Sequence, residues 1–195
     1  MFAYCNNNPV VSSDGSGCRP VCEEIEGPHV INGQDIDPYS DIKYGISTIG
    51  FSGCEVVAIY NALLLIGKYK SFSRIKSFVE LLLSRDGGYG QRGLFGADRY
   101  DIMSTLDHFD VSYVKLTYED LFSVEDGSVM IVGFWTKTTI LGFIRVPSIH
   151  TVAIKYDGEH YNVYNRYSDS RDTYRYTNAD FFGGEEKYIY GFKVN

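Results

Sequence analysis

The regular hydrophobic pattern of the chain starts near residue 52, and its first part has the period of a helix. Apolar residues over 58–66 recur every three or four positions, and Gly67 then provides a helix stop. Ser52 and Glu55 stand at the spacing of a capping box, which predicts a helix that begins at Ser52. The same period predicts two further helices, over 73–85 and 97–109.

Beyond residue 110 the hydrophobic pattern has the shorter period of strands. The predicted strands cover residues 111–116, 129–135, 149–156, 161–165 and 188–194, with a short helical turn at 117–120. Helices followed by an antiparallel sheet indicate an α+β fold. Residues 1–40 are rich in Asn, Ser, Gly, Asp and Pro and have no sustained period, so we predict an irregular N-terminal extension before a single domain over 41–195.

Cys54 is the first candidate for chemistry. The capping-box prediction places it in the first turn of a helix, where free amides and the helix dipole favour negative charge. A thiol in that position has a lowered pKa and more thiolate at neutral pH, which suits a nucleophile. The alternative is a small apolar side chain packed in the core.

His150 and Asn165 are the second candidates. Asp157-Gly158 is a strong hairpin signal, and a two-residue turn there pairs Tyr156 with Glu159 and His150 with Asn165. This register puts both polar residues at the end of a face that is otherwise apolar. An imidazole held by an amide can present its other nitrogen to a nucleophile, although a structural hydrogen bond would need the same pairing.

The order of a helix-start Cys, a sheet His and an Asn on the next strand resembles papain-like cysteine peptidases. The closer resemblance is to the C39-like branch, which processes bacteriocin leaders. It covers about residues 44–194 through GCEVVAIYNALLLIGK, SVMIVGFW and IHTVAIKYDGEHYNVYN. The resemblance implies a papain-like fold and a cysteine hydrolase without a cofactor, acting on a peptide or small amide. It assigns Cys54 as nucleophile, His150 as base and Asn165 as the third triad member, a position that is usually Asp in the C39-like branch.

Two positions depart from the family pattern. Thr48 stands where such enzymes carry an oxyanion glutamine, and Glu55 follows the cysteine where Gly or Trp is frequent. Thr48 is therefore the candidate oxyanion donor, and the loss of one such donor costs about 100-fold or more in rate. Two other functions stay open: a papain-fold acyltransferase that uses an amine as acceptor, and a non-catalytic peptide-binding relative.

The remaining cysteines precede the predicted domain. Cys5, Cys18 and Cys22, with His29, have the ligand types of a Cys3His zinc site, but their spacing is not that of a standard zinc finger. Reduced thiols or a disulfide are the preferred interpretation, so we expect no metal centre.

Net charge excludes one class of partner. The chain has 18 Lys and Arg against 25 Asp and Glu, a net charge of −7, and no block of basic residues. Nucleic-acid binding needs a basic footprint, so we expect none. The longest apolar run is too short to span a bilayer, and the start of the chain lacks the features of a signal peptide. We therefore expect a cytoplasmic protein if Met1 is the native start.

Overall fold

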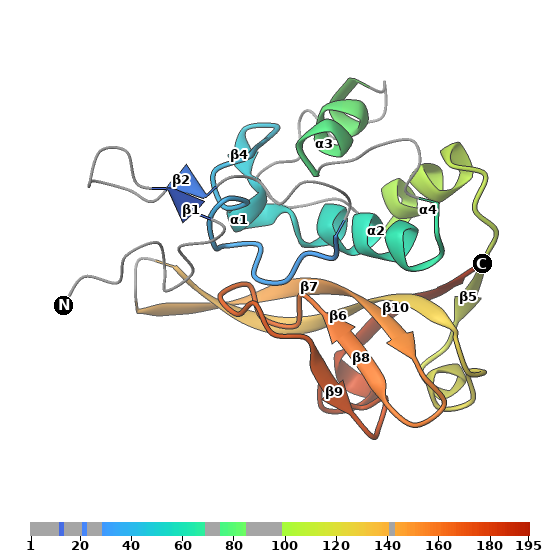
Figure 1. The fold of residues 1–195 in the computed structure, drawn as a ribbon. Coiled ribbons are helices and arrows are strands. Elements are labelled where there is room, and N and C mark those ends of the chain that lie inside the picture. Colours follow the sequence, from blue (N-terminus) through green and yellow to red (C-terminus); the bar gives the residue numbers. More distant parts are fainter. Residues whose placement is uncertain (1–11, 14–20, 23–28, 69–74, 85–98, 141–142) are drawn as a thin grey trace.

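The computed structural model describes residues 12–13, 21–22, 29–68, 75–84, 99–140 and 143–195. It confirms the α+β class: helices from the N-terminal half pack against a six-stranded antiparallel sheet from the C-terminal half. Figure 1 shows these helices gathered on one side of the sheet. None of the helices in the described ranges has the length and apolar character needed to cross a membrane.

The described helices follow the predicted periodicity with shorter bounds. They are α1 (Ile49–Ser52), α2 (Cys54–Leu65), α3 (Ile75–Ser84) and α4 (Arg99–His108). The predicted helix ends at 73–74, 85 and 97–98 lie outside the described residues. Gly67 ends α2 as predicted: it has a φ of 76°, and the next amide, of Lys68, donates to the Leu63 carbonyl at 2.8 Å.

The predicted capping box is wrong. Ser52 is the last residue of α1, and its hydroxyl donates to the Thr48 carbonyl at 3.4 Å. The break between α1 and α2 falls at Gly53, where an added Cβ would lie 2.6 Å from Ile49. Gly53, and not Ser52, is therefore the N-cap of α2, and it has no side chain to cap the helix. The Glu55 carboxylate accepts from the Cys54 thiol.

The sheet has the strand order β5-β10-β6-β7-β8-β9. Its strands are β5 (Tyr113–Leu116), β6 (Val129–Ile140), β7 (Ile144–Tyr156), β8 (Tyr161–Tyr164), β9 (Tyr174–Tyr176) and β10 (Tyr188–Val194). Short elements complete the described chain: β1 (Ser12–Ser13), β2 (Val21–Cys22), β3 (Lys43–Tyr44), β4 (Ser47–Thr48), η4 (Glu119–Phe122) and η5 (Glu185–Lys187). β6 and β7 run past their predicted ends and form a long hairpin, and β9 was not predicted.

Both faces of the sheet are buried, each by a different part of the chain. One face packs against α2 and includes Ala153 and Tyr190. The other face forms a second core, which includes Phe134 and Val152 together with Phe182 from the segment before β10. Successive residues of β7 therefore point into two separate cores.

Residues 29–40, which the sequence pattern assigns to the extension, contribute to the core beside α2. Ile31 is 1% exposed, and its backbone is held by Asn61 of α2. The Ile31 amide donates to Asn61 Oδ1 at 2.7 Å, and Asn61 Nδ2 donates to the Ile31 carbonyl at 2.8 Å. This stretch is irregular in backbone, but it is packed as part of the domain.

Candidate functional site

Cys54 is the first residue of α2 and its side chain is 7% exposed. The thiol donates to Glu55 Oε2 at 3.2 Å and lies 3.8 Å from the Ile149 carbonyl oxygen. Burial raises the pKa of the Cys54 thiol well above its ordinary value, and the Glu55 carboxylate raises it further. Bonds from the backbone amides of Thr151 and Glu55 act the other way but are weaker. In this environment the sulfur is a neutral thiol.

His150 lies on β7 with its ring against Phe134, in an edge contact at 5.8 Å between ring centroids. Its Nε2 lies 2.7 Å from the backbone oxygen of Asn165. A carbonyl oxygen only accepts, so Nε2 carries the proton of the neutral ring and Nδ1 is unprotonated. Burial lowers the pKa of His150, the bond to Asn165 partly opposes this, and the charge of Arg166 adds to the lowering, so that the pKa is about 4.

The predicted register between these strands is wrong by two residues. Tyr156 pairs with Tyr161, and Ile154 pairs with Val163, so His150 and Asn165 are not directly opposed. The Asp157 carboxylate accepts from the amides of Glu159 at 3.2 Å and His160 at 2.7 Å, which brings both residues into a four-residue turn. Because the shift is an even number of residues, each strand keeps the same side chains on the same face.

Asn165 contacts His150 through its backbone and not through its side chain. Its side chain is fully buried and bound to Gln34: Oδ1 accepts from the Gln34 amide at 3.1 Å, and Nδ2 donates to Gln34 Oε1 at 2.6 Å. Asn165 has a φ of 57°, a backbone conformation that asparagine tolerates better than most residues. Gln34 in turn donates to the Ile49 carbonyl of α1 at 3.0 Å.

The structure bonds His150 to Asn165, and among the described residues neither of them bonds to Cys54. Thr151 bonds to Tyr190 at 2.7 Å between hydroxyl oxygens and so belongs to the core beside α2. His150, one residue earlier, points into the opposite core with Phe134. Within the described residues no hydrogen bond or electrostatic interaction joins Cys54 to His150.

The other predicted site residues either make structural contacts or lie outside the residues that the structure describes. Thr48 is the N-cap of α1, and its hydroxyl accepts from the Phe51 amide at 3.4 Å. Cys5 and Cys18 lie outside the described residues, Cys22 is described only as part of β2, and His29 bonds to the Tyr39 hydroxyl. No group of three metal-binding side chains occurs in the part of the chain that the structure describes.

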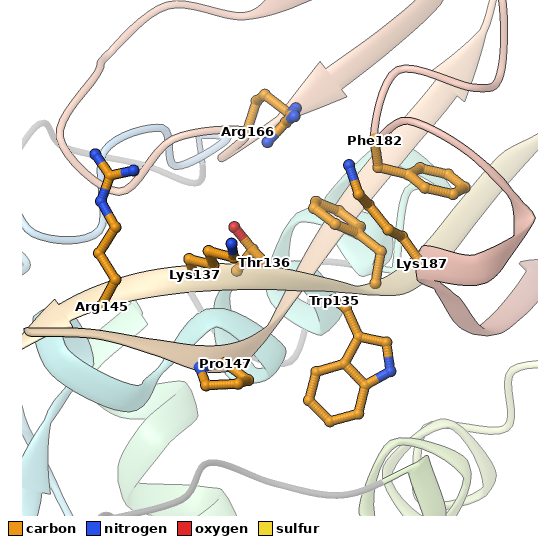
Figure 2. Close-up of a pocket in the computed structure, with 9 residues that line it drawn as sticks. Trp135, Thr136, Lys137, Arg145, Pro147, Arg166, Phe182 and Lys187 are labelled. Carbon is orange, nitrogen blue, oxygen red and sulfur yellow. The ribbon is translucent and has the colours of Figure 1, made fainter.

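Gln34 and Arg166 belong to the site although neither was predicted from the sequence. Gln34 falls in a stretch without periodicity, so no spacing links it to Asn165. Arg166 follows Asn165 directly, and its guanidinium lies over the Phe134 ring at 5.2 Å. Phe134 also lines a cavity of about 660 Å³, which therefore lies next to His150. Figure 2 shows residues that line this cavity, among them Arg166.

The lowered pKa of His150 predicts a loss of stability in mild acid. Between pH 6.5 and about 4 the unfolded chain binds a proton at this residue and the folded chain does not, so the free energy of unfolding falls as pH falls. We expect this residue to remove about 2 kcal/mol across that window, as measured by urea denaturation. His150→Gln keeps a donor for the Asn165 carbonyl but does not titrate, so its free energy of unfolding should change less with pH. If the free energy of unfolding changed equally with pH in wild type and His150→Gln, the lowered pKa would be contradicted.

No family model matches the chain, and a search of curated proteins finds no relative. The assignment of function therefore rests on the geometry of the site and on the resemblance in residue order.

Proposed function

We propose that this chain is a non-catalytic ligand-binding protein built on a papain-like arrangement. The observation that carries the proposal is that Cys54 and His150 have different partners: the Cys54 thiol bonds to Glu55, whereas His150 packs against Phe134 and bonds to the backbone oxygen of Asn165. The order of elements, with a buried helix that starts at Cys54 and a sheet that follows, supports the papain-like part of the proposal.

Acyl transfer by a cysteine needs a thiolate and an imidazole that protonates the leaving group at the same reacting carbon. Here the Cys54 thiol is kept neutral by burial and by Glu55, because a carboxylate beside a thiol disfavours the thiolate. The neutral imidazole of His150 is bonded to a backbone carbonyl and packed against Phe134. Each residue is therefore satisfied in its own surroundings without the other.

The test compares wild type with Cys54→Ala on a mixture of short peptides, with and without an added primary amine. Product analysis by mass spectrometry detects new peptide termini or amine conjugates. We expect the two proteins to give the same products. New termini that require Cys54 would show a hydrolase, and amine conjugates that require Cys54 would show an acyltransferase; either result would refute the proposal.

A cysteine hydrolase is the second candidate function. One observation favours it: Cys54 Sγ interacts with the backbone of Ile149 and Thr151, the two residues that flank His150. Cys54, the candidate nucleophile, therefore lies next to the part of β7 that carries His150, although the imidazole points to the face of the sheet that includes Phe134. A hydrolase would need the strand to present His150 on the α2 side, and the peptide assay above detects its product.

A further inference from the structure

The cavity beside His150 has an unusual charge for this protein. Among the described residues, four cationic side chains and no acidic one line it, although the chain as a whole has a net charge of −7. These four side chains come from different parts of the fold: β6, β7, the segment directly after β8, and the end of η5. They are Lys137, Arg145, Arg166 and Lys187.

None of these four cations forms an ion pair with any residue that the structure describes. Figure 2 shows Arg145, Arg166 and Lys187 on the same side of the β6–β7 ribbon, with Trp135 and Pro147 on the other. Like charges placed around one cavity repel one another, and the repulsion grows as water is replaced by protein. A bound anion would reverse the sign of this interaction.

Arg166 is already held in position. Its Nη2 donates to the Phe181 carbonyl at 3.2 Å, and its guanidinium lies over the rings of Phe134 and Tyr167, at 5.2 and 4.6 Å from their centroids. A guanidinium fixed in this way has lost its rotamer freedom before a ligand arrives, so less free energy is lost on binding.

The lining and size of the cavity restrict the ligand further. Its volume of about 660 Å³ suits a molecule of nucleotide size. Phe134 and Phe182 also line the cavity, but they are 1% and 5% exposed and stack on each other at 5.3 Å, so their ring faces are not open to a ligand. Two arginines and two lysines around one space match the multiple charges and fork-like geometry of a phosphate group better than a single carboxylate.

We infer that this cavity binds a small phosphate-bearing molecule. The phosphate lies among Lys137, Arg145, Arg166 and Lys187. This inference names the ligand class of the binding function proposed above and rests on it. It does not involve Cys54.

The test is isothermal titration calorimetry with the full chain at low ionic strength. The probes are pyrophosphate, ADP, adenosine and succinate. We expect ADP and pyrophosphate to bind, and adenosine and succinate to bind much more weakly than either. The double variant Lys137→Gln/Arg145→Gln changes two exposed side chains, so its fold should be retained, and we expect its affinity for ADP to fall by about tenfold or more.

The matched control is Lys43→Gln/Lys76→Gln, which removes the same charge from two exposed positions that do not line the cavity. We expect it to bind ADP as wild type does. The inference is overturned if neither ADP nor pyrophosphate binds, if both double variants lose affinity equally, or if succinate binds as tightly as pyrophosphate. These outcomes are separate from Cys54-dependent product in the peptide assay, which would overturn the proposed function alone.

Discussion

Replacing Asn165 by alanine is expected to lower the free energy of unfolding by about 3–4 kcal/mol. The side chain is fully buried, and its loss leaves both the Gln34 amide and Gln34 Oε1 without these partners. Alanine also adopts the φ of 57° at this position less readily than asparagine. Urea denaturation measures the change, and Asn178→Ala, at an exposed position, should lose less than about 1 kcal/mol.

Asn165→Asp separates a structural role from a catalytic one. Aspartate is the usual third member of the triad in the C39-like branch, so a catalytic Asn165 should tolerate it. In the structure, however, an aspartate oxygen would replace Nδ2 and face Gln34 Oε1, two acceptors with no proton between them. We expect Asn165→Asp to be destabilised nearly as much as Asn165→Ala. An unchanged stability together with a more reactive Cys54 would contradict the structural role.

Asn61→Ala is expected to lower the free energy of unfolding by about 3 kcal/mol, because two buried backbone groups lose their partner at once. Asn61 is 0% exposed and bonds to both the amide and the carbonyl of Ile31. Urea denaturation gives the global loss, and limited proteolysis shows whether cleavage near Ile31 becomes faster. A loss below about 1 kcal/mol without faster cleavage would contradict the view that residues 29–40 are packed as part of the domain.

The order of helices and strands could be predicted because each has a strong hydrophobic period. β10 matches its predicted bounds, and α2 ends at Gly67 as expected. The start of α2 was missed because Ser52 and Glu55 fit a capping box by spacing, while the chain places a glycine between two helices. Local spacing does not contain the tertiary contacts that decide between these two arrangements.

The relation between Cys54 and His150 could not be predicted for a different reason. Alternation along β7 correctly groups His150 with Val152 and Ile154 on one apolar face. It does not say which face α2 covers, because in this sheet both faces are buried. The register was missed because the Asp157 side chain enlarges the turn, a side-chain contact that a two-residue turn signal does not include.

The most direct test of the central claim is the pH dependence of Cys54 alkylation by iodoacetamide, in a background where Cys5, Cys18 and Cys22 are serine. It is measured in that protein and after the further change His150→Ala. We expect a Cys54 thiol that ionises only above the ordinary pKa of about 8.5, with the same profile in both proteins. A thiolate that forms below pH 7 and disappears in His150→Ala would show a Cys–His pair and would contradict the separate roles of the two residues.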